Sequence, residues 1–255
     1  GNEIEMKSIL VNNGFLLDFP EEVIKETEKL PDEVTETDKM QRLDMRGVPT
    51  FTIDPDTAKD FDDALSLRYP ENGDCEIGVH IADVTHYVQP GTALDEEAYK
   101  RSTSVYLVDR VLPMLPEKLS NNLCSLVPNQ DRLAFSAIFV FNNNDKIISR
   151  WFGKTIIHSN RRFTYEEAQE VIDKGDGEHA DELKKLNNLA DKLRRRRFKE
   201  GSIAFETDEV KFRLDEDGAP VEVYVKERKD THLLIEEYML LANREVAGFI
   251  SQKGR

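Results

Sequence analysis

A dense cluster of acidic side chains constrains this 255-residue chain more than any other feature. Five aspartates occur between Asp54 and Asp63, and the largely apolar run Ala64–Leu67 follows directly. Carboxylates this close repel one another, so a fold that gathers them needs a cation, or needs some of them to keep their protons. A divalent ion such as Mg²⁺ meets this need. Because Mg²⁺ usually shares its shell with water and substrate phosphate, the cluster indicates phosphodiester chemistry.

Two other interpretations of the acidic stretch have to be weighed. An EF-hand calcium loop does not fit, because Lys59 stands where the loop needs glycine and Leu65 where it needs the final glutamate. An acidic surface turn without an ion is the ordinary fate of aspartate-rich loops. Two features count against that interpretation. Pro55 holds Asp54 extended, and Phe61 with the apolar run after the cluster indicates a neighbouring core strand.

The overall charge limits how the chain could bind nucleic acid. There are 35 Lys and Arg against 50 Asp and Glu, which gives a formal net charge of −15. Bulk acidity argues against loose coating of nucleic acid, because affinity for phosphate depends on Lys and Arg. It does not exclude a basic channel on an acidic body, since the field that matters is local. Strong periodic segments also argue against disorder of the whole chain.

The two cysteines, Cys75 and Cys124, each lie within an apolar stretch. We interpret them as reduced core thiols of a cytosolic protein, with a disulfide between them as the less favoured alternative. No segment of the sequence has the apolar length to cross a bilayer, and the N-terminal residues lack a basic-then-apolar secretion signal. The expected location is the cytoplasm, with no membrane partner.

The pattern of the chain changes near residue 42. Residues 1–41 are rich in charges and predict one helix, Glu21–Leu30, followed by a linker over Pro31–Lys39. Beyond them, strand and helix patterns mix without regular alternation, which predicts an α+β domain. The predicted strands are Ala64–Tyr69, Glu76–Asp83, Arg132–Phe141 and Lys146–His158, with a second pair, Ile203–Leu214 and Val221–Lys226, turning at Asp217 and Gly218. The predicted helices are Ala93–Ser102, Thr164–Asp173, Ala180–Lys199 and Thr231–Ser251.

Three ordered motifs carry a resemblance to a known family. After the acidic stretch come His-Ile-Ala-Asp-Val, residues 80–84, and Leu-Pro-Glu-Lys-Leu-Ser, residues 115–120. In this order the motifs resemble the catalytic (RNB) domain of the ribonuclease II and ribonuclease R family of processive 3′-to-5′ exoribonucleases. The resemblance runs from residue 42 to residue 255 and implies the N-terminal part of that domain, with a mixed, mostly antiparallel sheet and packed helices. Residues 1–41 would then be a helical linker segment that precedes it.

The resemblance assigns the acidic cluster to catalysis. Asp54, Asp60, Asp62 and Asp63 match the four aspartates of the family motif one for one. They are expected to bind Mg²⁺, with Mn²⁺ as the alternative, and to hold or activate the attacking water. Asp62 is the residue whose loss we expect to be most damaging. Asp56 is outside the matched set and is expected to be solvated.

The resemblance also implies four RNA-binding residues. Tyr106 and Phe205 match two aromatics that stack on bases near the RNA end, although a core position is the ordinary interpretation of each. Tyr165 and Glu236 match the pair that recognises the ribose 2′-hydroxyl. Glu237 is the alternative if the alignment shifts by one residue, and a solvated helix face would explain both glutamates without any role in RNA binding.

Several other polar residues are not assigned to the site. His80 and His86 flank Asp83, but an imidazole among apolar neighbours is more often a hydrogen-bonded core group, and the cation of this family is held by oxygen. The run Arg194–Arg197 lies near a predicted helix end, where the helix dipole favours cations. It could contact RNA phosphate, and a solvated face explains it equally well.

The implied function is processive hydrolysis of single-stranded RNA from its 3′ end with release of nucleoside 5′-monophosphates, and no action on DNA is expected. In the family, cold-shock domains precede this region, and a Ser-Pro-Ile-Arg-type segment and an S1 domain follow it. None of these occurs in the sequence, so we expect weak activity, because one lost charge-stabilising donor costs about 10²–10³ in rate. The alternative is an inactive RNA-binding or regulatory relative, which the presence of all four aspartates disfavours.

Overall fold

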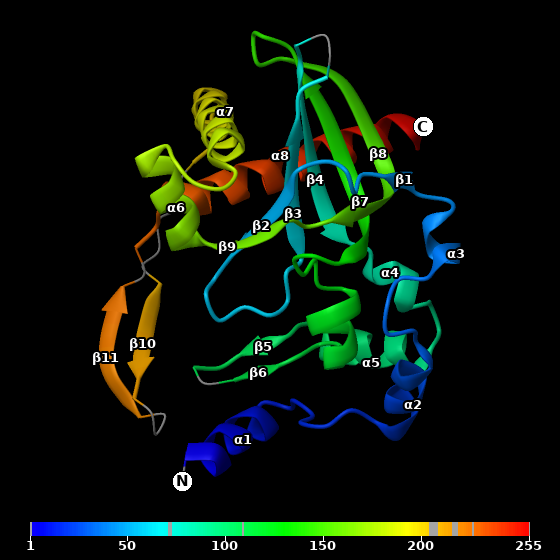
Figure 1. Ribbon diagram of the computed structural model, residues 1–255. Helices are drawn as coiled ribbons and strands as arrows, with labels where there is room; N and C mark the ends of the chain where they lie inside the picture. The colour runs from blue at the N-terminus through cyan, green and yellow to red at the C-terminus, as the bar shows by residue number, and fades with distance from the viewer. Residues whose placement is uncertain are drawn as a thin grey trace. The chain divides into compact units, whose positions relative to one another are not determined.

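The computed structural model consists of two compact units (Figure 1). The first unit combines Gly1–Glu33, Val84–Leu123 and Glu206–Glu227, and the second combines Val34–Asp83, Cys124–Phe205 and Arg228–Arg255. Within these bounds the structure describes residues 2–70, 73–108, 110–203, 209–215, 219–225 and 227–254. In that part of the chain, every helix is too short or too polar to cross a membrane.

The second unit is built on a seven-stranded sheet with the order β1-β8-β7-β4-β3-β2-β9. Its central strands pair antiparallel, while β1 with β8 and β2 with β9 pair in parallel. The mixed, mostly antiparallel α+β fold expected from the sequence is therefore confirmed. The strands are β1 (Leu43–Asp44), β2 (Thr50–Asp54), β3 (Asp63–Arg68), β4 (Cys75–Ala82), β7 (Asp131–Phe141), β8 (Ile147–His158) and β9 (Arg161–Thr164).

Helices α6 (Tyr165–Lys174), α7 (Ala180–Lys199) and α8 (Asp230–Lys253) pack against one face of this sheet (Figure 1). Alternating strand residues point to this face because side chains alternate along a strand. They form one core with apolar residues of the three helices. A capping box in which Thr164 and Glu167 bond reciprocally starts α6, the helix predicted over Thr164–Asp173.

The other face of the sheet carries a buried row of polar side chains. His80 lies between Ser136 and Ser66, with its Nδ1 atom 2.6 Å from Ser136 Oγ and its Nε2 atom 2.8 Å from Ser66 Oγ. Ser136 Oγ continues the row to Thr155 Oγ1 at 2.6 Å. Burial lowers the pKa of His80 to about 3, so the ring is neutral. The interpretation of His80 as a hydrogen-bonded core group is confirmed.

The first unit contains smaller elements. They are α1 (Asn2–Asn12), α2 (Glu21–Lys29), α4 (Val84–Tyr87), α5 (Ala93–Arg101), the π-helical turn η1 (Leu119–Leu123), and the hairpins β5 (Val105–Tyr106) with β6 (Val111–Leu112) and β10 (Val210–Leu214) with β11 (Pro220–Val225). The Glu26 carboxylate on α2 joins two helices by accepting the first two amides of α5, from Ala93 and Leu94. The negative charge also suits the positive end of the α5 dipole.

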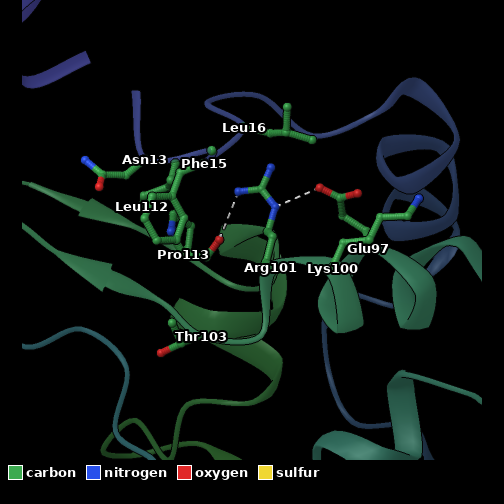
Figure 2. Close-up of a pocket in the computed structure, with 10 residues that line it drawn as sticks. Asn13, Phe15, Leu16, Glu97, Lys100, Arg101, Thr103, Leu112 and Pro113 are labelled. Carbon is green, nitrogen blue, oxygen red and sulfur yellow. Dashed lines mark hydrogen bonds and ion pairs between the residues drawn. The ribbon is translucent and has the colours of Figure 1, made fainter. Parts of the chain in front are cut away.

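A cavity of about 260 Å³ lies in the first unit around Arg101 (Figure 2). The guanidinium of Arg101 pairs with Glu97 at 2.8 Å and donates to the carbonyls of Pro113 and Asp18. It also lies 3.8 Å from the centre of the Phe19 ring. Because Arg101 is satisfied by these neighbours, the ion pair serves the packing of this unit.

The structure corrects several boundaries predicted from the sequence. Residues Glu36–Lys39 form a short helix, α3, inside the predicted linker, because Thr35 and Asp38 form a capping box. Helix α1 and strands β2 and β9 were not predicted at all. Of the strand predicted over Ile203–Leu214, the structure shows β10 at Val210–Leu214, while residues 204–208 and the predicted turn at Asp217 and Gly218 lie outside the described residues. Both cysteines are buried and free, as expected.

Gly78 allows the polar row of Ser66, His80 and Ser136 to pack tightly, so a larger residue at this position should destabilise the fold. A Cβ atom at Gly78 would lie 2.4 Å from Ser66 Oγ and 2.5 Å from His80 Nε2. We expect Gly78→Ala to lower the free energy of unfolding by about 1–3 kcal/mol, the usual cost of overpacking. Urea unfolding followed by the fluorescence of the single tryptophan, Trp151 in β8, measures the effect.

Gly47→Ala is the matched control, because a Cβ atom there would meet no other atom within 4 Å. It should change the unfolding free energy by no more than about 0.5 kcal/mol. Equal stability of the two variants would contradict the argument that the polar row needs a glycine.

Candidate active site

The sheet places two of the four predicted aspartates at neighbouring strand ends. Asp54 is the last residue of β2 and Asp63 the first of β3. The two strands pair only at Thr50 with Ser66 and Phe51 with Leu65, so they separate before they reach the aspartates. From there β2 continues its pairing with β9, up to Asp54 beside Thr164. The acidic loop, residues 55–62, bridges the gap and carries Asp60 and Asp62.

Burial and mutual repulsion raise the pKa values of these carboxyl groups. Asp54 is only 8% exposed, and burial followed by the charge of Asp63 raises its pKa to about 7. Burial, then the charge of Asp62, raises the pKa of Asp63 to about 6. Asp62 reaches the surface, yet the surrounding protein and the Asp60 carboxylate raise its pKa too. At neutral pH the site therefore holds negative charge at a high cost.

The donor atoms of Asp54 and Asp63 fit a hard cation. The Oδ2 atoms of both residues are buried and lack a hydrogen-bond partner, and an unsatisfied buried carboxylate is costly unless a charge compensates it. Among the described residues, no three His, Cys, Asp or Glu side chains already converge on one point. Mg²⁺ does not require that, because it is commonly held by one or two carboxylates together with water and substrate phosphate.

The structure brings Tyr165 to the same place. Tyr165 begins α6 directly after β9, the strand that pairs with the end of β2. Burial, then the charges of Asp63 and Asp54, raises the pKa of its hydroxyl to about 12. The ring stacks on His232 with centres 3.9 Å apart. The phenol therefore stays protonated and lies within the field of both carboxylates.

The two candidate glutamates on α8 have different surroundings. Glu237 is 3% exposed and forms an ion pair with Arg197. Glu236 is 39% exposed, pairs with Arg228, and lies 3.7 Å from Arg197. Glu236, the residue predicted to contact RNA, is thus the more accessible of the two, while the carboxylate of Glu237 is used in a buried pair.

The remaining predicted residues are placed as follows. Tyr106 belongs to the first unit, where it is 63% exposed on β5, so it is not a core tyrosine. Phe205 lies outside the described residues. The side chain of Asp56 is 87% exposed, which confirms that it is solvated. Within the basic run, Arg195 pairs with Asp191 on the same helix.

Sequence reasoning missed two polar residues that contact the acidic loop. Arg162 on β9 donates to the carbonyls of Pro55 and Asp56. Ser125 bonds to the backbone of Lys59 and Phe61. No local signal marks either residue, because both contacts join segments that are distant in the sequence.

Comparison with known proteins identifies the family. The family model described as the RNB domain matches residues 42–255. DIS3-like exonuclease 2 of Schizosaccharomyces pombe is 47% identical over 83% of this chain and 25% of its own length. The inactive exonuclease DIS3L2 of Arabidopsis thaliana is 40% identical over 100% of this chain and 26% of its own length. The chain thus spans about a quarter of the length of these curated relatives.

A solved structure agrees with the family match. Mycoplasma genitalium RNase R in complex with ribose methylated single-stranded RNA aligns with 98% of this chain and 40% of its own, at 30% sequence identity and a TM-score of 0.89. The sheet, the helices that cover it and the strand ends that carry Asp54 and Asp63 all lie within the matched residues. The chain therefore belongs to the RNB domain family.

Proposed function

We propose that this chain is part of a metal-dependent, processive 3′-to-5′ exoribonuclease that hydrolyses single-stranded RNA and releases nucleoside 5′-monophosphates. The observation that carries the proposal is the pair of buried, unpartnered carboxylate oxygens of Asp54 and Asp63 in a chain of the RNB family. A fold keeps such a costly pair where function requires it. The names of the relatives and the RNA-bound RNase R structure support the same activity. We also propose that the protein acts in the cytoplasm and does not hydrolyse DNA.

The proposed cofactor is Mg²⁺, with Mn²⁺ as the alternative, held by carboxylates of the set Asp54, Asp60, Asp62 and Asp63 together with water and substrate phosphate. A bound ion would act as a Lewis acid on the scissile phosphate and lower the pKa of an attacking water. The chain's own residues supply the oxygens and the burial that makes the charge effective. Without an ion, the pKa of about 7 means that Asp54 holds a proton in part of the molecules at neutral pH.

The proposed recognition of RNA uses two kinds of contact. Tyr165 and Glu236 would contact the ribose 2′-hydroxyl, because a phenol and a carboxylate together can donate and accept its hydrogen bonds. Tyr106 and Phe205 would stack on bases near the RNA end, which suits an enzyme that digests any sequence. The exposure of Tyr106 supports this role.

One observation favours a second candidate function, an inactive RNA-binding relative. The chain is 40% identical over its whole length to a protein named as inactive. A 5′-labelled RNA incubated with the full-length protein and Mg²⁺ separates the two functions. Stepwise shortening with mononucleotide release supports the enzyme, whereas binding without shortening supports the inactive relative.

Asp62→Asn tests the assignment of the acidic loop. In the full-length protein we expect it to lower RNA turnover about 10²–10³-fold, the range for the loss of one charge-stabilising group. RNA affinity should remain nearly unchanged, and single-turnover hydrolysis and filter binding measure the two quantities. Asp56→Asn is the control: its side chain is 87% exposed, and the substitution removes only a 3.9 Å ion pair with Arg162 and keeps the Asp56 carbonyl that Arg162 contacts, so turnover should stay normal. Normal turnover in Asp62→Asn would overturn the assignment.

Asp54→Asn tests the link between protons and metal. In the metal-free chain the raised pKa means that the folded state keeps a proton which the unfolded state releases near pH 3.8, so stability falls as the pH rises from about 4 to 7. Each pKa unit corresponds to about 1.4 kcal/mol. Mg²⁺ should restore stability above pH 7, where the carboxylates are free of protons.

Thermal unfolding followed by Trp151 fluorescence, with and without Mg²⁺, compares wild type with Asp54→Asn across this range. The variant should lose the part of the pH-dependent decline that Asp54 contributes and most of the stabilisation by Mg²⁺, because the amide neither titrates nor carries charge, while Asp63 and Asp62 still titrate. Identical pH profiles and Mg²⁺ responses in both proteins would contradict the proposed metal site.

Tyr165→Phe tests the recognition of ribose. Removing only the hydroxyl should slow hydrolysis of RNA about tenfold, which corresponds to one lost hydrogen bond of about 1.4 kcal/mol. An oligonucleotide with a 2′-deoxy 3′ end should be hydrolysed at an unchanged rate, because it has no 2′-hydroxyl to lose. Tyr99→Phe, at a side chain that is 85% exposed, is the control. Equal slowing of both substrates would argue against this role.

A further inference from the structure

The carboxylates of the acidic loop repel one another, and the residues of the loop alone do not offset this repulsion. Residues 55–62 carry Asp60 and Asp62 next to Asp54 and Asp63, and like charges at this spacing push a chain segment apart. The strand pairing on either side does not extend to the loop, because β2 and β3 separate after Phe51 and Leu65. Contacts from other segments must therefore hold the loop in place.

Arg162 holds the first half of the loop. From β9 its Nη2 atom donates to the carbonyl of Pro55 and, at 2.9 Å, to the carbonyl of Asp56. The same guanidinium lies 5.5 Å from the centre of the Phe61 ring, in the second half of the loop. Its positive charge also lowers the pKa of Asp54, against the larger opposing effect of burial. One side chain thus contacts both halves of the loop and offsets part of its repulsion.

Ser125 holds the second half. Its Oγ atom accepts a hydrogen bond from the amide of Phe61 at 2.9 Å and donates one to the carbonyl of Lys59 at 2.8 Å. These two residues enclose Asp60 in the sequence, so the hydroxyl fixes the backbone on both sides of it. Ser125 is completely buried, and its own carbonyl accepts a hydrogen bond from the buried Arg132 at 3.0 Å.

Two backbone hydrogen bonds complete the attachment of the loop. The amide of Leu126 donates to the carbonyl of Phe61 at 2.8 Å, and the amide of Ala82 donates to the carbonyl of Asp62 at 3.0 Å. The residues next to Ser125 and strand β4 therefore hydrogen-bond to the loop as far as Asp62, the residue before β3. The side chains of Arg162 and Ser125 are the parts of this attachment that a substitution can remove.

We propose that Arg162 and Ser125 are positioning residues that hold the acidic loop at its two halves and so set Asp60 and Asp62 relative to Asp54 and Asp63. The inference rests on the proposed function in that these carboxylates would bind the metal ion. It deepens that function, because neither residue needs to touch the ion or the RNA. Residues that orient metal ligands typically change metal affinity or activity 10–100-fold when they are replaced.

The test compares Arg162→Gln and Ser125→Ala with matched controls. Arg161→Gln removes the neighbouring arginine, which pairs with Glu178. Ser159→Ala removes another buried serine, whose hydroxyl donates to the carbonyl of Arg161. Calorimetric titration with Mn²⁺ gives metal affinity, and hydrogen exchange of the metal-free chain gives the protection of the Ala58 and Phe61 amides. Urea unfolding separates these readouts from a general loss of stability.

Arg162→Gln and Ser125→Ala should raise the Mn²⁺ dissociation constant about 10–100-fold and speed exchange at the loop amides about tenfold or more. Arg161→Gln and Ser159→Ala should match wild type in both measurements. Arg162→Lys should resemble Arg162→Gln, because the shorter lysine lacks both the flat guanidinium near the Phe61 ring and the Nη2 atom that donates to the two loop carbonyls. Wild-type affinity in Arg162→Lys would mean that charge alone is needed and would overturn the positioning role of Arg162.

The two readouts separate this inference from the proposed function. Unchanged Mn²⁺ affinity in both Arg162→Gln and Ser125→Ala overturns the inference, whatever the exchange rates are. If wild type itself binds no Mn²⁺, the proposed metal site fails, and hydrogen exchange alone decides whether the two residues hold the loop. Exchange equal to wild type in the two variants would then overturn the inference as well.

Discussion

The repulsion between buried carboxylates is the constraint on which the architecture of the second unit depends. Asp54 and Asp63 lie at strand ends where β2 leaves β3, and the surrounding protein removes most of the water that would screen their charges. A flexible segment would relieve this repulsion by moving the charges into solvent. Strand pairing on both sides prevents that movement, since β2 is bonded to β9 as far as Asp54 and β3 to β4 from Asp63 onward. The sheet thus preserves an unfavourable arrangement that an ion could stabilise.

The same sheet contains a second cluster of buried polar side chains, in which the hydrogen-bonding atoms have partners. Along the row through Ser66, His80 and Ser136, each neighbour supplies a hydrogen-bond partner within 2.8 Å, and the imidazole is neutral. Such a network stabilises the fold and needs no ligand. The carboxylates of Asp54 and Asp63 differ, because each keeps a buried oxygen without a partner. This contrast within one sheet supports the proposal that the acidic cluster, and not the His80 row, is the reactive site.

The sequence predicts those elements of the fold whose pattern lies within a few neighbouring residues, and it does not predict contacts between distant segments. The Thr164 capping box and the apolar spacing of α7 predict two helices, because both signals lie within a few residues. The parallel pairing of β2 with β9 joins Asp54 to Thr164 across the chain, and no local pattern reveals it. For that reason the motif identifies the four aspartates, whereas Arg162 and Ser125, which are 106 and 64 residues from the loop atoms they contact, are visible only in the fold.

Sequence identity does not decide between an active enzyme and an inactive relative, because this chain is similar to an exonuclease and to a protein named as inactive. The energetic cost of gathering the four carboxylates bears on the same question. Replacing one carboxylate by an amide would relieve the repulsion that raises the pKa values of Asp54 and Asp63. A protein without the chemistry would gain stability from such a change and lose nothing. This chain instead keeps all four carboxylates and places a phenol, Tyr165, in the field of Asp63 and Asp54. The proposed binding of a cation and a phosphodiester would explain why the chain keeps an arrangement that opposes folding, and this favours the proposal of an active enzyme over an inactive relative.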